Sequence, residues 1–382
     1  MKCLIKVTNH IVIIHFRPLD GYPPIQNLLK IFAKKENVKL SVFSTVSSKS
    51  GRDFSIENSE IHWSDTFIGY QNRFVRLFAG YLLFYIKCFT FLLLKRPKKI
   101  IYFESISALP CLMYKWIFKQ KELFVHYHEY TTKDEYATGM FIERLSHSVE
   151  KKMYDSFKWI SHTNKERLAF FANDCNIKND QILRVMPNYP MSDWNKVKSE
   201  TIQVPTGKNC LRFIYVGPIN FEDTYVKEMC IYIGSRPEAT LEIVSNRIPQ
   251  YFLDFIHRNN YTNITLLGEV KNSDLPHLLQ SNKIGLILYK CKTQNQIYAQ
   301  PNKLFEYLRV GLDVWFPKEM IGCYEFQSLE NTKVVCIDFN NIEISEKNHL
   351  PVFNDSMNFS HDYTAENATS ELMKSLRLCN GK

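Results

Sequence analysis

The chain has 382 residues, of which 45% are hydrophobic and 23% are charged, a balance typical of a folded protein large enough for two hydrophobic cores. Disorder over most of its length is therefore not expected. The formal net charge of +9 suits an anionic ligand or an anionic membrane surface, but it is too small to indicate nucleic-acid binding by itself.

Ten cysteines are spread along the chain, without a Cys-x-x-Cys pair and without histidines at zinc-ligand spacing. This pattern indicates reduced thiols in a cytosol. The alternation from Met1 to Phe16 is that of a first strand and not of a signal peptide. We therefore expect a cytoplasmic protein, peripheral at the inner face of the cell membrane if it binds lipid, with no metal and no cofactor.

An apolar stretch from Tyr81 to Leu94 contains Lys87 and is shorter than the roughly 20 residues that cross a bilayer. We expect a buried helix of the first domain, with an interfacial membrane helix as the alternative. Basic residues flank the stretch: Arg73, Arg76, Lys95, Arg96, Lys98 and Lys99. They would favour anionic lipid if that face were exposed, and otherwise form a solvated charge cluster.

Short apolar strands alternate with amphipathic helices twice along the chain. The predicted strands of the first half are Ile11 to Phe16, Lys39 to Phe43, Lys99 to Phe103, Leu123 to His128 and Trp159 to His162. Those of the second half are Leu211 to Val216, Ala239 to Val244, Asn263 to Leu267, Lys283 to Tyr289, Asp313 to Phe316 and Val334 to Ile337. We predict an α/β chain of two Rossmann-like doubly wound domains facing a central cleft, with ligands at the carboxyl ends of the strands.

The periodic pattern stops around Asn188 to Cys210, where polar residues, Pro and Gly indicate an interdomain linker. We therefore place a first Rossmann-like domain at residues 1–195 and a second one at residues 205–360. A last helix, Thr364 to Leu378 within residues 361–382, is expected to fold back on the first domain.

The segment YAQPNKLFEYLRVG, Tyr298 to Gly311, combines a helix start with charges at helical spacing. Pro301 and Asn302 open the helix, whose free amides favour a pyrophosphate, and Lys303 adds a positive charge there. Glu306 shares part of that face and can accept hydrogen bonds from ribose hydroxyls. The alternative is a surface ion pair between Lys303 and Glu306 on an amphipathic helix.

Five segments follow one another in the second half: FIYVGPI from Phe213, LEIVSN from Leu241, ITLLGEV from Ile264, DLPHLLQSNKIGLILY from Asp274 and PNKLFEYLRVGLDV from Pro301. In this order they resemble the retaining GT-B glycosyltransferases of group 1 type, in the branch that builds capsular, O-antigen and other surface polysaccharides. In the first half, VHYHEY from Val125 and VMPNYP from Val185 are similar to segments of the same family.

The resemblance implies a nucleotide-sugar donor whose pyrophosphate lies at the start of the Pro301 helix, with Glu306 on the ribose and Gly217 in a loop that approaches the phosphates. It also implies sugar transfer with retention of configuration, without a metal, to a lipid-linked or oligosaccharide acceptor. The leaving diphosphate would then be stabilised by helix ends and by Lys303.

In the first domain, Gly21 matches a glycine loop of the family that faces the reaction centre. His128 would lie beside the transferred sugar, where a neutral imidazole can bind a hydroxyl or relay a proton, and Glu129 is the second catalytic candidate. The alternative for His128 is a strand-end histidine bonded to the backbone.

The sequence departs from the family where Tyr298 replaces the first of two glutamates, and where Lys227 is the single basic residue after the Gly217 loop, with Glu222 and Asp223 closer to it. These departures favour a catalytically silent scaffold as an alternative function. A sugar-nucleotide epimerase of the same fold is the other alternative, although it should carry a richer set of acids and bases than the sequence indicates. No motif supports nucleic-acid binding.

Overall fold

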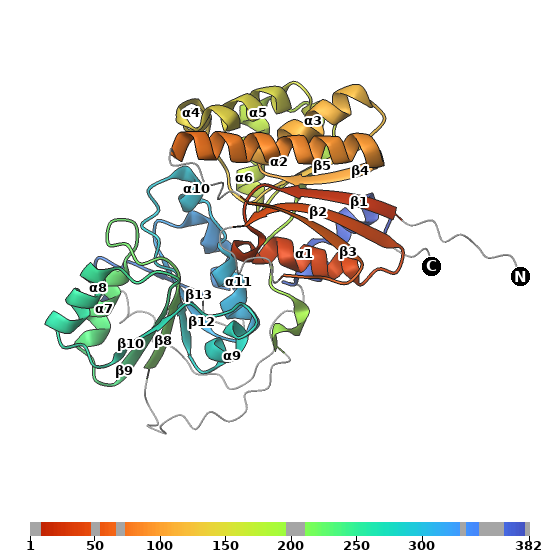
Figure 1. Ribbon diagram of the computed structural model, residues 1–382. Helices are drawn as coiled ribbons and strands as arrows, with labels where there is room; N and C mark the ends of the chain where they lie inside the picture. The colour runs from red at the N-terminus through yellow and green to blue at the C-terminus, as the bar shows by residue number, and fades with distance from the viewer. Residues whose placement is uncertain are drawn as a thin grey trace, which may run out of the picture. The chain divides into compact units, whose positions relative to one another are not determined.

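The computed structural model describes residues 9–46, 54–65, 73–195, 211–328, 334–343 and 363–378. Residues 1–8 and residues 196–210 of the predicted linker lie outside the described residues. Among those described, unit 1 contains the chain up to Asn188 and again from Ala365 onward, and unit 2 runs from Tyr189 to Thr364 (Figure 1).

Seven described strands form the parallel sheet of unit 1. Their spatial order is β3 (Ser59–Asp65), β2 (Val38–Val46), β1 (Asn9–His15), β4 (Lys99–Phe103), β5 (Glu122–Tyr127), β6 (Trp159–His162) and β7 (Leu183–Val185). Parallel neighbours need crossover connections, which are mostly helices. The sheet is consequently covered by helices, and its inner strand β1 is apolar towards both faces, with Ile11, Val12, Ile13 and Ile14 fully buried.

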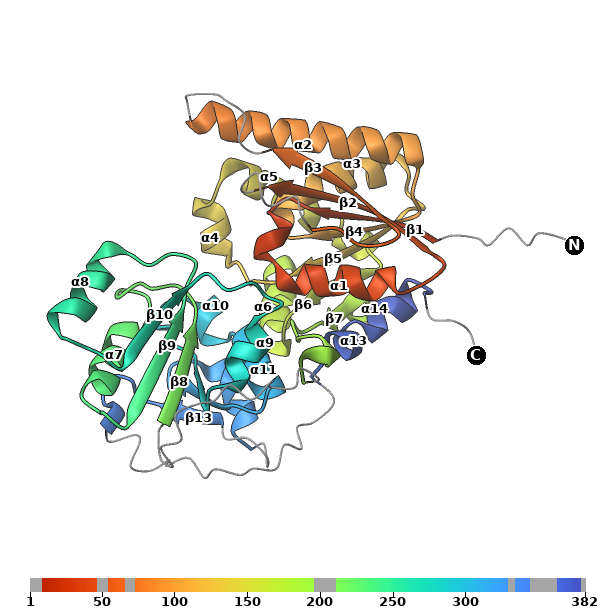
Figure 2. The same cartoon turned by 60° about the horizontal axis from the view of Figure 1, so that its bottom comes forward.

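The helices of unit 1 cover both faces of its sheet. They are α1 (Pro23–Ala33), α2 (Arg73–Lys95), α3 (Ala108–Ile117), α4 (Lys133–Thr138), α5 (Phe141–Lys151) and α6 (Lys165–Cys175), followed near the end of the chain by α13 (Ala365–Ala368) and α14 (Ser370–Ser375). Figures 1 and 2 show α2, α3 and α5 on one face and α1 on the other. Val12 and Ile14 contribute to the core on the α2 side.

The apolar stretch predicted as a buried helix lies in α2, which is buried along one side only. Phe84, Cys88 and Leu92, four residues apart, have no exposed surface and pack into the core. The opposite side of α2 is exposed because no described element covers it. In the described part of the chain, no helix is both long and apolar enough to cross a membrane.

The end of the described chain belongs to unit 1. In place of one helix from Thr364 to Leu378 there are two short ones, α13 and α14, separated at Thr369. The ammonium of Lys99, at the start of β4, donates a hydrogen bond to the carbonyl of Leu376, and Arg184 of β7 lies 3.5 Å from Glu371 of α14. These contacts hold the segment to the amino ends of β4 and β7.

Six described strands form the parallel sheet of unit 2. Their order is β10 (Ile264–Gly268), β9 (Ala239–Val244), β8 (Leu211–Val216), β11 (Ile284–Leu286), β12 (Asp313–Pro317) and β13 (Val334–Ile337), the order of a Rossmann sheet. Its helices are α7 (Val226–Gly234), α8 (Gln250–Arg258), α9 (Leu275–Gln280), α10 (Gln294–Ile297) and α11 (Asn302–Arg309). The predicted class, two Rossmann-like α/β domains, is confirmed.

Candidate functional site

Helix α11 of unit 2 is fixed at the carboxyl edge of the sheet by Tyr307. The buried Tyr307 hydroxyl accepts a hydrogen bond from the amide of Val216, the last residue of β8, at 3.2 Å. It donates to the carbonyl of Leu286, the last residue of β11, at 3.4 Å. Gly285 allows this packing, because a Cβ there would lie 2.3 Å from the Tyr307 ring. The amino end of α11 therefore lies at the edge where ligands of such sheets bind.

The predicted donor-binding residues lie at this amino end. The helix begins at Asn302, one residue later than predicted, with Pro301 as its N-cap residue. The first amides of a helix have no partner within it, so they can receive an anion. Lys303 and Glu306 form an ion pair three residues apart. It is not the surface pair of the alternative interpretation, because the Glu306 side chain is almost completely buried and Lys303 is largely buried.

The segment before α11 is held in place by a 3-10 helix, Ile321–Ser328. A Cβ on Gly322 would lie 2.5 Å from the carbonyl oxygen of Ala299, so only glycine permits this approach of two backbones. The side-chain amide of Gln300 donates to Glu325 in the same 3-10 helix. The amide of Ala299 is already bonded to the Gln296 carbonyl at 3.2 Å, so it is not available to a donor sugar in this arrangement.

Gly217 follows β8, and the space beside it is occupied. A Cβ on Gly217 would lie 2.6 Å from the Tyr215 hydroxyl oxygen, which donates to the carbonyl of Pro218 at 2.8 Å. The Gly217 amide donates to the carbonyl of Val244 at 3.0 Å. A side chain at this position would therefore displace the Tyr215 hydroxyl from the Pro218 carbonyl, a packing relationship that the sequence did not indicate.

A cavity of about 620 Å³ opens beside this loop, between the segments that follow β8 and β9. Its volume falls in the range of small-molecule sites. Its walls are Pro218, Ile219, Asn220, Phe221, Glu222, Ser245, Asn246, Arg247, Pro249 and Tyr251. The predicted residues of α11 do not line it. The segment that lines it follows β8, and the last residue of β8, Val216, is bonded to Tyr307 of α11.

Arg247 is a basic residue of this cavity that the sequence analysis missed. Its side chain is exposed. Within the described residues, the structure shows no ion pair between its guanidinium and a carboxylate, although Glu222 lines the same cavity. The family resemblance directed attention to the loop after β8, whereas Arg247 follows β9. A basic residue three positions after an apolar strand was the signal that could have identified it.

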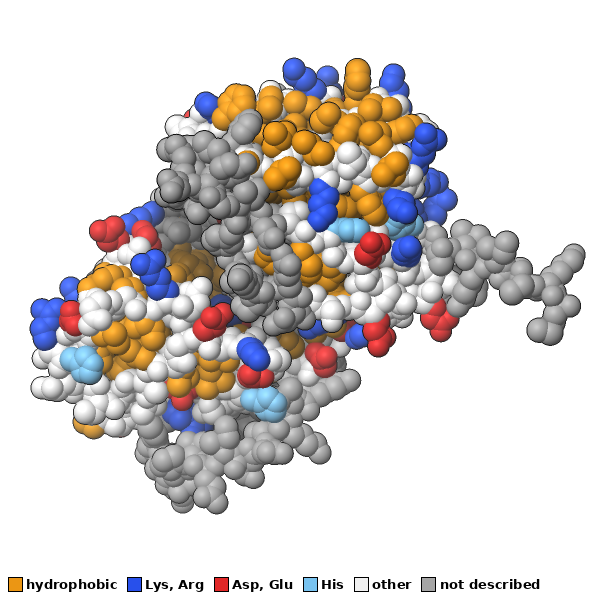
Figure 3. Space-filling model, in the orientation of Figure 1, with side chains coloured by type: hydrophobic (Ala, Val, Ile, Leu, Met, Phe, Trp, Pro, Cys, Tyr) orange, Lys and Arg blue, Asp and Glu red, His pale blue; other side chains and the backbone are white. Residues whose placement is uncertain are grey.

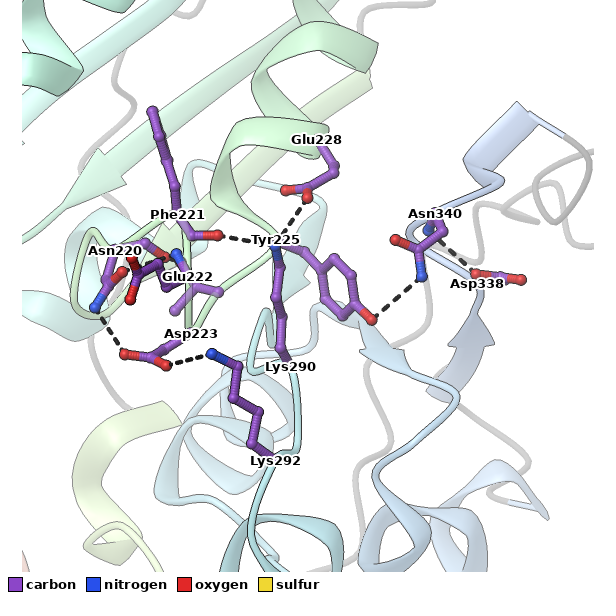
Figure 4. Close-up of polar contacts among 11 residues, drawn as sticks. Asn220, Phe221, Glu222, Asp223, Tyr225, Glu228, Lys290, Lys292, Asp338 and Asn340 are labelled. Carbon is purple, nitrogen blue, oxygen red and sulfur yellow. Dashed lines mark hydrogen bonds and ion pairs between the residues drawn. The ribbon is translucent and has the colours of Figure 1, made fainter.

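The loop after β8 is braced by polar contacts, which Figure 4 shows. The Asn220 amide donates to Asp223 at 2.7 Å, and Lys292 pairs with Asp223 at 3.0 Å. The acidic charge that the sequence places near the loop is thus partly offset by Lys292, from the segment after β11.

A second lysine from that segment ties the loop to helix α7. Lys290 donates to the carbonyl of Phe221 at 2.8 Å and to the Glu228 carboxylate at 2.9 Å (Figure 4). On the other side, Asn340 donates to the Tyr225 hydroxyl at 3.5 Å (Figure 4). The cavity wall is consequently preorganised by contacts that do not require a ligand.

Unit 1 has a small cavity of its own, of about 50 Å³, at the carboxyl ends of its strands. Three carboxylates line it, those of Glu104, Glu129 and Glu143, and the remaining walls are Arg17, Tyr22, Ser105, Ile106, His128, Thr131 and Tyr136. This set of acids and bases is richer than the sequence indicated. A space of this size admits one hydroxyl-sized group and not a whole sugar ring.

Glu104 is the acid of this cavity that the sequence analysis did not single out. It follows β4 directly and has a φ of 61°, a left-handed conformation that is costly for a side chain other than glycine. Burial, together with the charge of Glu129, raises the pKa of Glu104 to about 8, although a hydrogen bond from the His128 amide opposes the shift. Glu104 is therefore mostly protonated at neutral pH, as a proton donor must be.

His128 and Glu129 follow β5 and line the same cavity. Nδ1 of His128 lies 3.2 Å from Oδ1 of Asn188, and its ring stacks on Phe103. Burial lowers the pKa of His128 to about 4, despite the hydrogen bond to Asn188. Its Nε2 is buried and has no hydrogen-bond partner in the described structure. A neutral His128 can thus accept a hydrogen bond through Nε2 near pH 7. Glu129 is exposed.

Gly21 ends the 3-10 helix Leu19–Gly21 that follows β1. A Cβ there would meet nothing within 4 Å, so packing does not require a glycine. The same loop brings two side chains to the cavity, where Arg17 donates to the Tyr22 hydroxyl at 2.8 Å. Across the described residues, no three His, Cys, Asp or Glu side chains are grouped in a way that could hold a metal ion.

Two parallel-sheet α/β units with these strand orders define the GT-B class of fold. No family model and no curated protein matches the sequence. Among solved structures, the chain is similar to the UDP-GlcNAc 2-epimerase of Neisseria meningitidis bound to UDP-GlcNAc, with 12% identity, a TM-score of 0.63, and 96% of this chain and 99% of that chain covered.

Two further solved structures show the same likeness. Anabaena HepE in complex with UDP and glucose has 11% identity and a TM-score of 0.62, over 97% of this chain and 96% of that chain. Sucrose-phosphate synthase from Thermosynechococcus elongatus has 14% identity and a TM-score of 0.61, over 96% of this chain and 94% of that chain. At these identities the likeness establishes the fold alone.

Proposed function

We propose that the protein is a metal-independent glycosyltransferase. It moves a sugar from a nucleotide-sugar donor to a lipid-linked or oligosaccharide acceptor in surface polysaccharide synthesis, with retention of configuration. The observation that carries this proposal is the amino end of α11, where the amides of Asn302 and Lys303, the Lys303 ammonium and the buried Glu306 lie at the carboxyl edge of the unit 2 sheet, while the Leu304 amide is bonded to the Pro301 carbonyl.

The donor pyrophosphate is proposed to bind at these amides and beside Lys303. A phosphate oxygen can then replace the Glu306 carboxylate as the partner of Lys303. Glu306, released from the ion pair, accepts hydrogen bonds from the ribose hydroxyls. Because the helix end and Lys303 are fixed before the reaction, they also stabilise the negative charge that develops on the leaving diphosphate.

Arg247 and the 620 Å³ cavity extend this donor site. The exposed guanidinium supplies the positive charge that the loop after β8 lacks, and a planar fork of N–H groups suits phosphate oxygens. The cavity wall is braced by Lys290 and Lys292, so little ordering is required when a ligand enters.

The cavity of unit 1 is proposed to receive the reacting hydroxyl. Nε2 of the neutral His128 accepts a hydrogen bond from a sugar hydroxyl. With a pKa of about 4 it is a weak base, which argues against the proton relay considered from the sequence. Glu104, with a pKa of about 8, is the better proton carrier, and the exposed Glu129 can contact a polar ligand at the cavity mouth.

A second candidate function, a sugar-nucleotide epimerase, is favoured by one observation. Glu104, Glu129 and Glu143 gather around one small cavity together with tyrosines, and an epimerase needs such a set to move protons on the sugar. The solved structures of this fold that carry UDP or UDP-GlcNAc make uridine nucleotides the first ligands to test for either function.

The deciding experiment is calorimetric titration of the purified protein with UDP, GDP, CMP and dTDP sugars without added metal. The sugar that binds is then incubated with the protein in D2O and followed by proton NMR. A donor that stays intact until an acceptor is added supports the transferase. A new epimer formed without acceptor supports the epimerase. Binding without any turnover indicates a silent scaffold, and absence of binding to all four classes overturns the proposal.

A further inference from the structure

Helix α2 is apolar on two opposite sides. Phe84, Cys88 and Leu92 are buried against the sheet. Leu82, Ile86 and Leu94, offset from them by two residues, occupy the other side, where they form a stripe with the neighbouring Leu83. Leu83 is 55% exposed, Ile86 50% and Leu94 80%. A surface helix of a globular domain normally presents polar residues on its outer side, so this pattern requires a second apolar environment.

The neighbouring helix α3 continues the stripe. Trp116 is 75% exposed and Ile117 is 48% exposed at its carboxyl end, although α3 packs beside α2. We define the α2–α3 surface as Leu82, Leu83, Ile86, Leu94, Trp116 and Ile117. Figure 3 shows hydrophobic side chains gathered over α2, with Lys and Arg side chains along the edge of that region. A contiguous exposed patch of this kind marks an interaction site.

The charged residues within α2 and α3 are all basic. Neither α2 nor α3 contains an acidic residue. Lys95 and Arg96 are exposed at the end of α2, and Lys119 is exposed just after α3. Lys98 is also exposed, and it lies 3.9 Å from Glu122. A tryptophan beside apolar and basic residues is the composition of a membrane interface, where the indole and the lysines lie at the level of the headgroups.

We propose that the α2–α3 surface docks on an anionic phospholipid membrane, with the leucines and Ile86 in the headgroup and acyl boundary and the basic residues against lipid phosphates. A second copy of the chain fits less well, because a symmetric interface would bring two basic rims together. The inference is independent of the enzymatic activity, because it rests on α2 and α3. Neither helix contributes a lining residue to either cavity.

The test is co-sedimentation of the full chain with vesicles of phosphatidylcholine, with and without phosphatidylglycerol. We expect binding to the anionic vesicles, weakened by added salt. The variant Leu83→Gln/Ile86→Gln/Leu94→Gln should lose at least about tenfold in affinity, because three apolar side chains no longer enter the lipid. Lys95→Gln/Lys119→Gln should lose about fivefold for each lysine.

The matched control is Ile231→Gln/Leu267→Gln, which removes two exposed apolar side chains of unit 2 and should bind vesicles like the parent. All positions are exposed, so the fold should be kept, and circular dichroism with nucleotide-sugar calorimetry checks this separately from lipid binding. Equal binding by the triple variant, or no preference for phosphatidylglycerol, overturns the proposal. So does a lipid-free dimer that the triple variant dissociates, because the surface would then join two copies.

Discussion

The backbone amide of His128 donates a hydrogen bond to the carboxyl group of Glu104 at 2.7 Å, so the residue that follows β5 fixes the acid that follows β4. This contact explains how Glu104 is held in a left-handed conformation. Glu104, whose pKa is close to neutral, and His128 line the same small cavity of unit 1. Strain at a cavity lined by acids is consistent with a reaction site.

The raised pKa of Glu104 makes the stability of the protein depend on pH. The unfolded chain releases this proton near the ordinary value of 4.5, whereas the folded protein keeps it to about 8. The contribution of Glu104 to the free energy of unfolding should therefore be fully present below pH 4.5. It should be lost progressively as pH rises to 8. The contribution lost is up to about 4 kcal/mol.

Urea unfolding of the parent and of Glu104→Gln at pH 5 and pH 8 measures this contribution. The variant, which carries no titrating group at this position, should lose less stability between the two values than the parent. Glu57→Gln, at an exposed position, is the control and should follow the parent. Parallel pH curves for the parent and Glu104→Gln would show that Glu104 is not a protonated acid in the folded protein.

The sequence predicted the central strands of both sheets well because long apolar runs have few alternatives. Lys99–Phe103, Leu211–Val216 and Ala239–Val244 have the predicted bounds. The edge strands of unit 1 were missed. Ser59–Asp65 is largely polar and Leu183–Val185 has only three residues, so neither differs from a loop until its neighbour is present.

The residues of the candidate site could be predicted from the sequence only where they belong to one continuous segment. Pro301, Lys303 and Glu306 lie in one helix, and the helix period alone places them together. The cavities depend on tertiary structure. Arg247 meets the loop after β8 only because β8 and β9 are neighbours, and Glu104 meets Glu129 because β4 and β5 pair. No spacing along the chain records such proximity.

Gly322 should be required for the position of α11. A Cβ on Gly322 would lie within 2.6 Å of two backbone oxygens, those of Ala299 and Tyr298, which cannot move as a side chain can. We expect Gly322→Ala to cost about 1–3 kcal/mol of stability. Gly21→Ala is the matched control, since its Cβ meets nothing, and it should be neutral or stabilising by up to about 1 kcal/mol. Thermal or urea unfolding of both variants and of the parent measures these differences in stability. A Gly322→Ala protein as stable as the parent would contradict the claim that the close approach of Gly322 to the Ala299 and Tyr298 carbonyls requires a glycine.

Arg247 should contribute to the binding of the donor phosphates. Because it is exposed and no carboxylate is seen paired with it in the described structure, Arg247→Ala should leave stability within about 0.5 kcal/mol of the parent. It should lower the affinity for the nucleoside diphosphate by about tenfold, the loss of one charge-assisted contact. Calorimetric titration at low and high salt measures the affinity and its electrostatic part, and urea unfolding measures the stability. Arg236→Ala serves as the control outside the cavity, and equal losses for the two variants would point to general charge and not to this site.

Glu306 and Lys303 give the sharpest test of the donor site. If Glu306 binds the ribose, Glu306→Ala should weaken UDP or the preferred nucleotide about tenfold, while inorganic pyrophosphate binds as well or better, because Lys303 has lost its intramolecular partner. If the pair is only structural, both ligands should bind as before and only stability should fall, by about 1–3 kcal/mol, since Lys303 stays partly exposed. Lys318→Ala, at the exposed pair with Asp338, controls for loss of a surface ion pair and should change neither affinity. Lys303→Ala should weaken both ligands, since the proposed site places the phosphates of both beside this lysine.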